Sequence, residues 1–354
     1  MKLALIYGAR PEFIRLSAII PRLQQQAEVV TIHTGQNYDY GLNEVFFEEL
    51  RVPRPQHFLE ATGTFDEQLG TMFPKLGAIL RAEKPDRFVV LGDTNSSMGA
   101  IVAKRLGIPV FHLESGNRCL DPRSPEEVNR RIIDHCSDVH MAYSERSRQN
   151  LLAEGIPIGR TYVIGNPMFE VIGRADRLCR AGVGSIPSEP FFLSTFHRQE
   201  NVDDPLRLQS ILEGLGRLAE RFSRRVLVST HPRTRARLEV LGAASERLDF
   251  MDPVGFKRFI DLERVADLVL SDSGTCPEEC AIFGKPCVIL RDSTERQELV
   301  ESGCAVVAGV DADAIVRAGE GMLSRPLPGL CPPDYLRPQV SEAVASIALG
   351  HHLF

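Results

Sequence analysis

Short apolar segments alternate with longer segments of mixed polarity along the whole chain. The longer segments repeat apolar residues three or four positions apart, as on one face of a helix. The short ones read as strands that are apolar on both faces, which predicts parallel sheets covered by helices on both sides. In the first half of the chain, the predicted strands lie at 3–7, 29–34, 87–92, 109–114, 139–144 and 161–166.

The pattern restarts after a polar stretch, AGVGSIPSEP, at 181–190. A chain of 354 residues is longer than one hydrophobic core usually serves. We therefore predict an α/β protein of two Rossmann-like, doubly wound parallel-sheet domains, 1–172 and 173–335, with the hinge near 170–190. A final amphipathic helix within 336–354 either stays separate or returns to the first domain. The predicted strands of the second half lie at 190–197, 225–232, 248–253, 267–274, 286–292 and 305–310.

Polar and ionisable residues collect where the predicted strands end. In doubly wound sheets, ligands bind beyond the carboxyl ends of the strands. Any single end is explained about as well by a helix cap or a buried hydrogen bond. Taken together, they predict a binding cleft between the two domains. The ends concerned are 8–12, 34–36, 92–94, 112–114, 165–166, 196–198, 231–233, 272–274 and 291–292.

The segment SDSGTCPEECAIFGKP, at 271–286, leaves a predicted strand and opens a helix with Glu278 and Glu279 in its first turn. The start of a helix offers unpaired N–H groups and a partial positive charge, which suit a phosphate. A carboxylate beside them can accept hydrogen bonds from sugar hydroxyls. An ordinary helix start, capped by Ser273 or Thr275, explains the segment about equally well.

Four residues at strand or helix starts and ends are candidates for acid–base chemistry: Asp93, Glu114, Glu126 and His197. Several carboxylates in one cleft raise the pKa of some of them, so that one acts as an acid while another acts as a base. Arginines in the same regions can hold a diphosphate without a metal. These arginines are Arg10, Arg15, Arg118, Arg130, Arg198, Arg233 and Arg296.

Composition and missing motifs narrow the class of protein. The chain is 43% hydrophobic and 25% charged, with a net charge of −6, which argues against a nucleic-acid or membrane-surface partner. No apolar stretch is long enough for a signal region or a membrane span, so we expect a cytoplasmic protein. The eight cysteines contain no C-x-x-C pair and are expected to be reduced thiols.

No cofactor or metal is expected. The chain has no P-loop, and the G-x-G-x-x-A match at 214–219 lies inside a helical pattern, where it is no dinucleotide fingerprint. A metal site built from Asp93, His112 and Glu114 is a weaker hypothesis, because no paired-ligand spacing supports it.

These residues stand in blocks that resemble the non-hydrolysing UDP-N-acetylglucosamine 2-epimerases. The resemblance implies two Rossmann-like domains of the glycosyltransferase-B type, with the active site in the interdomain cleft, a UDP-sugar substrate, and a homodimer. It also implies inversion at C2 of a UDP-N-acetylhexosamine: UDP is eliminated to leave a 2-acetamidoglucal and then adds back. The blocks, in family order, are GARPEFIRLS, HTGQNYDY, VLGDTNSSMGA, HLESGNR, PEEVNRRIIDH, VIGNP, FHRQENV, THPR and SDSGTCPEECAIFGKPCVILRDSTER.

The resemblance gives roles to the candidates. Asp93, Glu114, Glu126 and His197 match catalytic positions. In the UDP site, Ser273 and Gly274 match a phosphate-binding turn, Glu279 a ribose-binding carboxylate, and Phe259 an aromatic near uracil. With the residues singled out above, the candidate substrate-binding set is Arg10, Arg15, Arg130, Phe259, Ser273, Gly274, Thr275, Glu279 and Arg296.

Departures from the family pattern leave the substrate open. TGQNYDY, GNRC and HPRTR are closer to a branch that forms UDP-N-acetyl-L-fucosamine from a 6-deoxy UDP-L-sugar, whereas FHRQEN and TERQE differ from that branch. Residues 36–40 replace a block that serves an allosteric site in many bacterial members. The sequence is also compatible with a hydrolysing 2-epimerase and with a glycosyltransferase of the same fold. We prefer interconversion of UDP-GlcNAc and UDP-ManNAc as the representative reaction.

Overall fold

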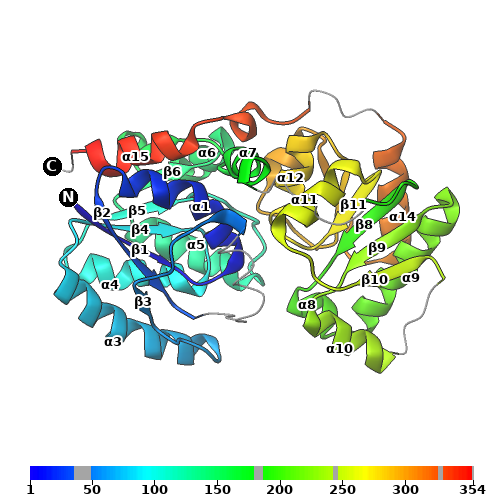
Figure 1. Ribbon diagram of the computed structural model, residues 1–354, viewed down its shortest axis with the longest axis horizontal. Coiled ribbons are helices and arrows are strands. Elements are labelled where there is room, and N and C mark those ends of the chain that lie inside the picture. The colour runs from blue at the N-terminus through cyan, green and yellow to red at the C-terminus, as the bar shows by residue number, and fades with distance from the viewer. Residues whose placement is uncertain (36–48, 179–185, 242–245, 326–329, 353–354) are drawn as a thin grey trace. The chain divides into compact units, whose positions relative to one another are not determined.

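The computed structural model describes residues 1–35, 49–178, 186–241, 246–325 and 330–352 (Figure 1). The chain divides into two compact units. Unit 1 comprises Met1–Leu178 and Asp334–Phe354, and unit 2 comprises Cys179–Pro333. Part of the stretch in which we expected the hinge lies outside the described residues, and so does the block at 36–40.

Unit 1 contains a parallel sheet whose order is β3-β2-β1-β4-β5-β6-β7. Six of these strands coincide with predicted ones. The seventh, β3, was missed because two residues are too few to show a periodic pattern. The strands are β1 (Lys2–Tyr7), β2 (Glu28–His33), β3 (His57–Phe58), β4 (Arg87–Leu91), β5 (Val110–Leu113), β6 (Val139–Ala142) and β7 (Thr161–Val163).

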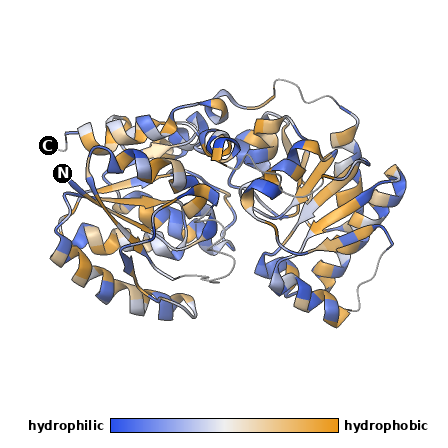
Figure 2. Cartoon of the chain, viewed as in Figure 1, coloured by the Kyte–Doolittle hydropathy of each residue, from blue (hydrophilic) through white to orange (hydrophobic). Residues whose placement is uncertain are grey.

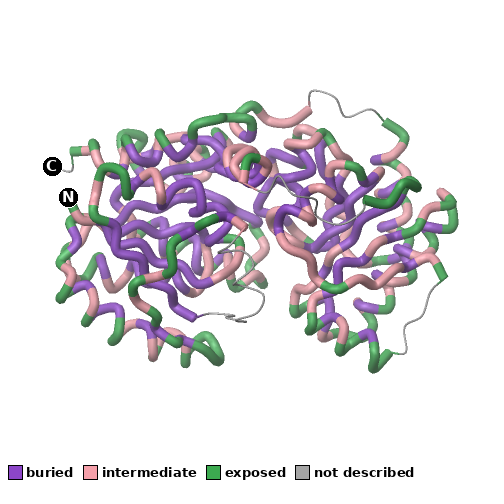
Figure 3. Tube along the Cα trace, viewed as in Figure 1, coloured by how far each residue is buried: buried purple, intermediate pink, exposed green. Residues whose placement is uncertain are grey.

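The central strands of unit 1 are apolar and buried along almost their whole length (Figures 2 and 3). The helices that cover these strands begin at residues that suit the first turn of a helix. Pro11 in the first turn of α1, for example, has no N–H to leave unpaired there. The helices are α1 (Arg10–Gln24), α3 (Phe65–Glu83), α4 (Gly99–Arg105), α5 (Pro125–Cys136), α6 (Glu145–Ala153), α7 (Met168–Leu178) and α15 (Val340–Gly350), with short 3-10 turns η1 (Asn95–Met98), η2 (Ile158–Arg160) and η3 (Pro333–Leu336).

Unit 2 repeats this architecture with a parallel sheet in the order β10-β9-β8-β11-β12-β13. All six strands coincide with predicted ones. They are β8 (Phe191–Thr195), β9 (Arg225–Ser229), β10 (Leu248–Met251), β11 (Leu268–Ser271), β12 (Cys287–Ile289) and β13 (Ala305–Val307). The helices are α8 (Gln199–Val202), α9 (Pro205–Phe222), α10 (Pro232–Leu241), α11 (Phe256–Val265), α12 (Cys276–Phe283), α13 (Gln297–Glu301) and α14 (Ala312–Leu323).

The glycines of the G-x-G-x-x-A match have a packing role in this unit. Gly214 lies inside α9, where a Cβ would come within 3.0 Å of Ile315 on α14. The small residue therefore lets the two helices approach closely. This location agrees with our interpretation that the match is no dinucleotide fingerprint.

The last helix, α15, belongs to unit 1 and packs against α1. Arg87 at the start of β4 donates hydrogen bonds to the carbonyl oxygens of Ala348 and His351, each at 2.6 Å. A cation at this end of a helix satisfies carbonyl groups that lack partners within the helix. Within the described part of the chain, no helix is long and apolar enough to cross a membrane.

We predict that Arg87→Ala lowers the free energy of unfolding by about 1–3 kcal/mol, because hydrogen bonds from a charged group contribute about that much. Urea denaturation followed by circular dichroism measures the loss. The control is Arg105→Ala on an exposed position of α4, which should change stability by less than about 0.5 kcal/mol. Equal losses in the two variants would contradict the tie between α15 and the sheet.

Candidate active site

In both sheets the strand order reverses at one point, between β1 and β4 in unit 1 and between β8 and β11 in unit 2. Loops at such a switch point diverge and open a crevice at the carboxyl ends of the strands. Most candidate residues lie on the segments that leave these strands or the adjacent β5. Each unit therefore has its own group of candidate residues.

In unit 1, Glu12 joins the two strands of the switch point. Its buried carboxylate accepts hydrogen bonds from the backbone N–H groups of Gly8 and Ala9, at 2.9 and 2.8 Å, in the turn after β1. The hydroxyl of Thr94, in the turn after β4, donates to the same side chain at 2.8 Å. Burial raises the pKa of Glu12 to about 7, although the hydrogen bonds oppose this rise. The turn that precedes Arg10 is thereby held by a side chain that the sequence candidates did not include.

Asp93 lies in the turn after β4 and is bound by Arg130 of α5. The Nε and Nη2 atoms of Arg130 lie 2.7 and 2.6 Å from one carboxylate oxygen of Asp93. Arg130 is buried and also donates to Glu127 at 3.0 Å, while Asn129 donates to the backbone carbonyl of Asp93. Two side chains of α5, Arg130 and Asn129, thus fix Asp93, and Glu127 holds Arg130. Glu126 is half-buried in the same turn and accepts a hydrogen bond from Ser124 at 2.9 Å.

Glu114 follows β5 in a left-handed backbone conformation, with φ of +68°. Such a conformation costs a residue with a Cβ about 1–3 kcal/mol and is frequent at functional sites. The carboxylate is buried, 3.3 Å from the guanidinium of Arg15 on α1, and accepts a hydrogen bond from Asn117 at 3.3 Å. Arg15 thus provides a buried positive charge next to this candidate acid or base.

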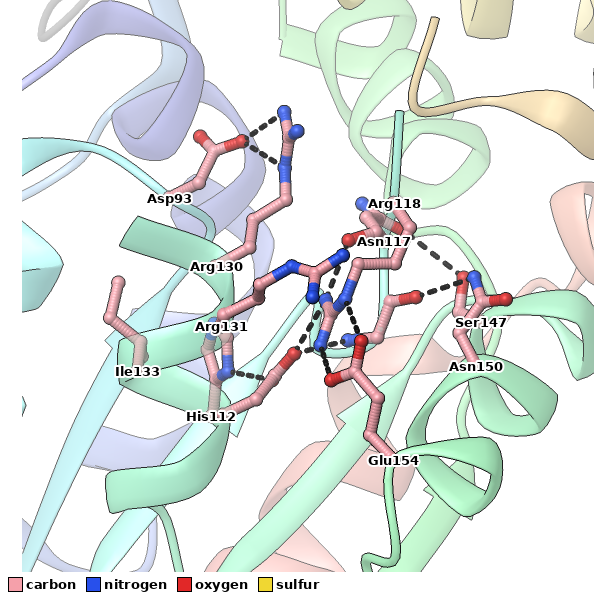
Figure 4. Close-up of polar contacts among 12 residues, drawn as sticks. Asp93, His112, Asn117, Arg118, Arg130, Arg131, Ile133, Ser147, Asn150 and Glu154 are labelled. Atoms are coloured by element: carbon pink, nitrogen blue, oxygen red, sulfur yellow. Dashed lines mark hydrogen bonds and ion pairs between the residues drawn. The ribbon is translucent and has the colours of Figure 1, made fainter. Parts of the chain in front are cut away.

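A buried network lies behind these carboxylates (Figure 4). His112 on β5 has one ring nitrogen 2.8 Å from Asp134 and the other 2.9 Å from the carbonyl oxygen of Gly92. Both nitrogens of His112 are thus occupied, which disfavours the metal site considered with Asp93 and Glu114. Arg118 lies 2.8 Å from Asp134 and also pairs with Glu154.

The charge of Asp134 is stabilised strongly within this network. Burial alone raises the pKa of a carboxyl group, but the hydrogen bond from His112 and the positive charge of Arg118 outweigh it, and the pKa of Asp134 is held well below its usual range. The guanidinium of Arg118, which the sequence offered as a diphosphate ligand, is used inside unit 1. The network fixes the carbonyl of Gly92, which directly precedes Asp93.

In unit 2, Asp272 plays the part that Glu12 plays in unit 1. It follows β11, is fully buried, and accepts hydrogen bonds from the backbone N–H groups of His197 and Arg198 in the turn after β8, at 3.1 and 2.9 Å. The amide of Asn201 donates to it at 3.0 Å. The ring of His197 remains 35% exposed, with Nδ1 3.7 Å from Asp272. Asp272 therefore positions the turn that carries the candidate catalytic histidine.

The candidate phosphate-binding turn lies directly after Asp272. The hydroxyl of Ser273 accepts the N–H of Thr275 at 3.3 Å, and Gly274 lies between them. All three residues are half-buried, and α12 begins at Cys276. The turn thus presents small side chains and the start of a helix together.

The two glutamates of the first turn of α12 are both buried, but they have different partners. Glu278 forms an ion pair with Arg296, whose side chain is also buried. Glu279 lies beside Glu263 of α11, the helix that also carries the half-buried Phe259. The structure thus brings His197, the 273–275 turn and Glu279 to one edge of unit 2, and sets Arg296 against Glu278.

Several carboxylates of these sites received no catalytic or binding role from the sequence, although 8–12 and 272–274 were among the polar strand ends; they include Glu12, Glu127, Asp272 and Glu263. A signal existed for Asp272, because an acidic residue directly after the buried strand LVLS needs hydrogen-bond donors. Glu12 sits three residues after Ala9, the spacing at which an acidic side chain reaches back to the start of its own helix. Nothing in the sequence pattern separates Glu127 from Glu126, or marks Glu263 as buried.

Two parallel α/β sheets with polar groups at their switch points are typical of proteins that bind a ligand beyond the carboxyl ends of the strands. Comparison with known proteins identifies the family. The profile of the family described as UDP-N-acetylglucosamine 2-epimerase matches residues 21–348. A UDP-N-acetylglucosamine 2-epimerase of Methanocaldococcus jannaschii is 39% identical over 340 residues, which cover 92% of this chain and 93% of that protein.

Solved structures agree. The UDP-GlcNAc 2-epimerase of M. jannaschii, in complex with UDP-GlcNAc and UDP, aligns with a TM-score of 0.92 and 36% identity over 98% of this chain and 99% of that one. The Rickettsia bellii enzyme of the same name aligns with a TM-score of 0.90 and 34% identity over 99% and 96% of the two chains. A UDP-2,3-diacetamido-2,3-dideoxy-D-glucuronate 2-epimerase of Pseudomonas aeruginosa is 37% identical over 92% of this chain and 93% of that protein.

The chain belongs to the UDP-N-acetylglucosamine 2-epimerase family and is an epimerase. The family resemblance read from the sequence blocks is therefore confirmed, as is the prediction of an α/β protein with two Rossmann-like parallel sheets. The narrower resemblance to the branch that forms UDP-N-acetyl-L-fucosamine stays a prediction.

The pKa of Glu12 predicts a pH dependence of stability. The pKa is about 7 in the folded protein and near the ordinary value of 4.5 in the unfolded chain, so the stability linked to this group is fully present below pH 4.5 and is lost as the pH rises through 7. Between pH 5 and 8, the unfolding free energy of the wild type should fall relative to that of Glu12→Gln by on the order of 3 kcal/mol.

Thermal and urea denaturation at a series of pH values measure this difference. Glu220→Gln, at an exposed position of α9, is the control and should follow the wild type at every pH. If the difference between wild type and Glu12→Gln stays constant from pH 5 to 8, the buried carboxylate does not hold a proton in the folded protein.

Proposed function

We propose that this protein inverts the configuration at C2 of a UDP-N-acetylhexosamine, with UDP-GlcNAc and UDP-ManNAc as the representative pair. The main support is its likeness, over almost the whole chain, to a 2-epimerase whose structure contains UDP-GlcNAc and UDP. Each candidate catalytic position carries a side chain that can transfer a proton, which agrees with this proposal. These residues are Asp93, Glu114, Glu126 and His197.

In this proposal the nucleotide binds to unit 2. The diphosphate lies at the 273–275 turn, where hydroxyls and the N–H groups at the start of α12 favour an anion. Glu279 accepts hydrogen bonds from the ribose hydroxyls, and the ring of Phe259 lies near uracil. Arg10, Arg15 and Arg130 supply positive charge to the substrate site, whereas Arg296 is paired with the buried Glu278.

The chemistry requires removal of a weakly acidic proton from C2 while the C1–O bond to UDP breaks. The products of this step are a 2-acetamidoglucal, UDP and a protonated base. In the return step, a proton is added to the opposite face of C2, and a diphosphate oxygen of UDP re-forms the bond to C1. Two acid–base groups on opposite faces of the sugar are therefore needed.

The residues of both units can supply these groups without a cofactor. Asp93 and Glu114 are carboxylates with an arginine as neighbour, Arg130 and Arg15 respectively. Each arginine holds the neighbouring carboxylate in a fixed position. His197 is the partly exposed candidate of unit 2, with Asp272 beside its ring. We assign proton transfer at C2 to this set together with Glu126, and we propose a homodimer, as in the family.

The name of one relative suggests a second substrate class. The relative from P. aeruginosa acts, by its name, on a diacetamido uronic acid, and its identity of 37% is close to that of the M. jannaschii enzyme. The 6-deoxy UDP-L-sugar suggested by TGQNYDY, GNRC and HPRTR is a third substrate. All three share the UDP group and the acetamido group at C2, so the proposed proton transfer is the same.

We predict that the purified protein exchanges the C2 proton of at least one of these three UDP-sugars for deuterium in D2O, because every turnover removes and returns that proton. NMR of the sugar ring measures the exchange and the appearance of the C2 epimer. Release of free N-acetylmannosamine would instead indicate a hydrolysing 2-epimerase. If none of the three sugars exchanges its C2 proton, the proposed reaction fails.

We predict that Asp93→Asn and His197→Asn each lower kcat by about 10²–10⁴-fold, the usual contribution of an acid–base group. Both variants should keep the thermal stability of the wild type within a few degrees. His135→Asn, at an exposed histidine of α5, is the matched control and should retain full activity. A near-normal rate of either first variant would remove that residue from the proposed mechanism.

A further inference from the structure

A cluster of buried acidic groups lies next to the proposed nucleotide site, where α11 packs against α12 (Figure 1). Glu263 of α11 and Cys276 and Glu279 of α12 each place one side-chain atom within 4.8 Å of the other two. The exposed fractions of these residues are 0%, 2% and 3%. Both carboxylate oxygens of Glu263 are buried and have no hydrogen-bond partner among the described residues. The function proposed above uses Glu279 but gives Glu263 no role.

Two carboxylates this close in a water-excluded site cannot both be ionised, because burial and mutual repulsion both oppose the second charge. The nearby thiols add no charge, since burial raises the pKa of Cys276 and of Cys280 well above the usual value. A third nearby thiol, that of Cys287, is also buried. One of the two carboxyl groups therefore keeps its proton.

Cations of the surrounding helix are engaged elsewhere. Lys257 and Arg264 of α11 both contact Asp261, and Arg264 lies over the ring of Phe283. Arg296 is paired with Glu278, the neighbour of Glu279 in sequence. The proton kept by this pair therefore balances charge that Lys257, Arg264 and Arg296 do not neutralise.

The proton belongs on Glu263. Burial, followed by the negative charge of Glu279, raises the pKa of Glu263 well above its usual value. Glu279 lies in the first turn of α12, where the partial positive charge of the helix start favours an ionised side chain. Glu263 lies in the last turn of α11, where that effect is reversed.

We propose that Glu263 is kept as a neutral acid whose O–H group donates a hydrogen bond to one carboxylate oxygen of Glu279 and so directs the other oxygen to the ribose hydroxyls of the nucleotide. This inference rests on the proposed function, because it takes Glu279 as the ribose-binding group. Glu263 is then a positioning residue, and nucleotide binding requires its proton.

The test compares UDP affinity, by calorimetry from pH 6 to 9, among the wild type, Glu263→Gln and Glu263→Leu. An amide is neutral and donates a hydrogen bond, so Glu263→Gln should bind UDP within about threefold of the wild type at pH 6.5. Glu263→Leu cannot donate and should bind about tenfold more weakly or worse. Titration of UDP itself is the same for all three proteins and cancels in the comparison.

The pH profile separates this role from simple support of the fold. In the wild type, UDP affinity should fall on the alkaline side as Glu263 loses its proton and repels Glu279, and in Glu263→Gln this fall should be absent. Equal affinity of the Gln and Leu variants, or the same alkaline fall in wild type and Glu263→Gln, overturns the proposal. Should Glu263→Leu fail to fold, the profile of Glu263→Gln decides alone.

Two further measurements keep the inference separate from the function on which it rests. Glu279→Gln should weaken UDP binding about tenfold or more; unchanged affinity would refute the ribose role itself, whereas a loss there with no effect of the Glu263 variants refutes only the present inference. Metal analysis of the purified wild type provides the other measurement. Stoichiometric zinc held by Glu263, Cys276 and Glu279 would overturn the shared proton.

Discussion

Buried carboxylates at the switch points of the two sheets hold the rest of the candidate site in position. Glu12 connects the turns after β1 and β4, and Asp272 connects the turns after β8 and β11. Each uses a side chain to satisfy backbone N–H groups that the diverging strands leave without partners. The two units thus share one solution, although the acidic residue lies in a helix in one and directly after a strand in the other.

The units differ in how they balance buried negative charge. Unit 1 places an arginine beside several of its acidic groups, as with Arg130 and Asp93 or Arg118 and Asp134, whereas Glu12 is held by backbone N–H groups and Thr94. Unit 2 relies on backbone and amide N–H groups around Asp272 and on a retained proton between Glu263 and Glu279. Positive charge in unit 1 suits the proposed chemistry, in which the UDP anion departs. Neutral donors in unit 2 suit recognition of hydroxyl and phosphate groups.

The sequence predicted every strand of the two sheets except β3, because burial on both faces leaves a short continuous apolar run between turn residues. It also predicted that the ends of β4, β5, β8 and β11 carry the polar groups. Partners of individual charges were beyond its reach. Arg118 and Arg296 look like ligands for a diphosphate in the sequence, yet their guanidinium groups meet Asp134 and Glu278 in the fold. Such pairs join residues 16 or more positions apart, which no local pattern encodes.

The return of α15 to the first unit has a topological consequence. Unit 2 is a single continuous stretch of chain inserted between α7 and α15, whereas unit 1 is assembled from both ends of the polypeptide. During synthesis on the ribosome, residues 1–178 of unit 1 are therefore made first, and α15 is added only after unit 2 has been made. A chain truncated after unit 2 would contain a first unit without the helix that packs against α1.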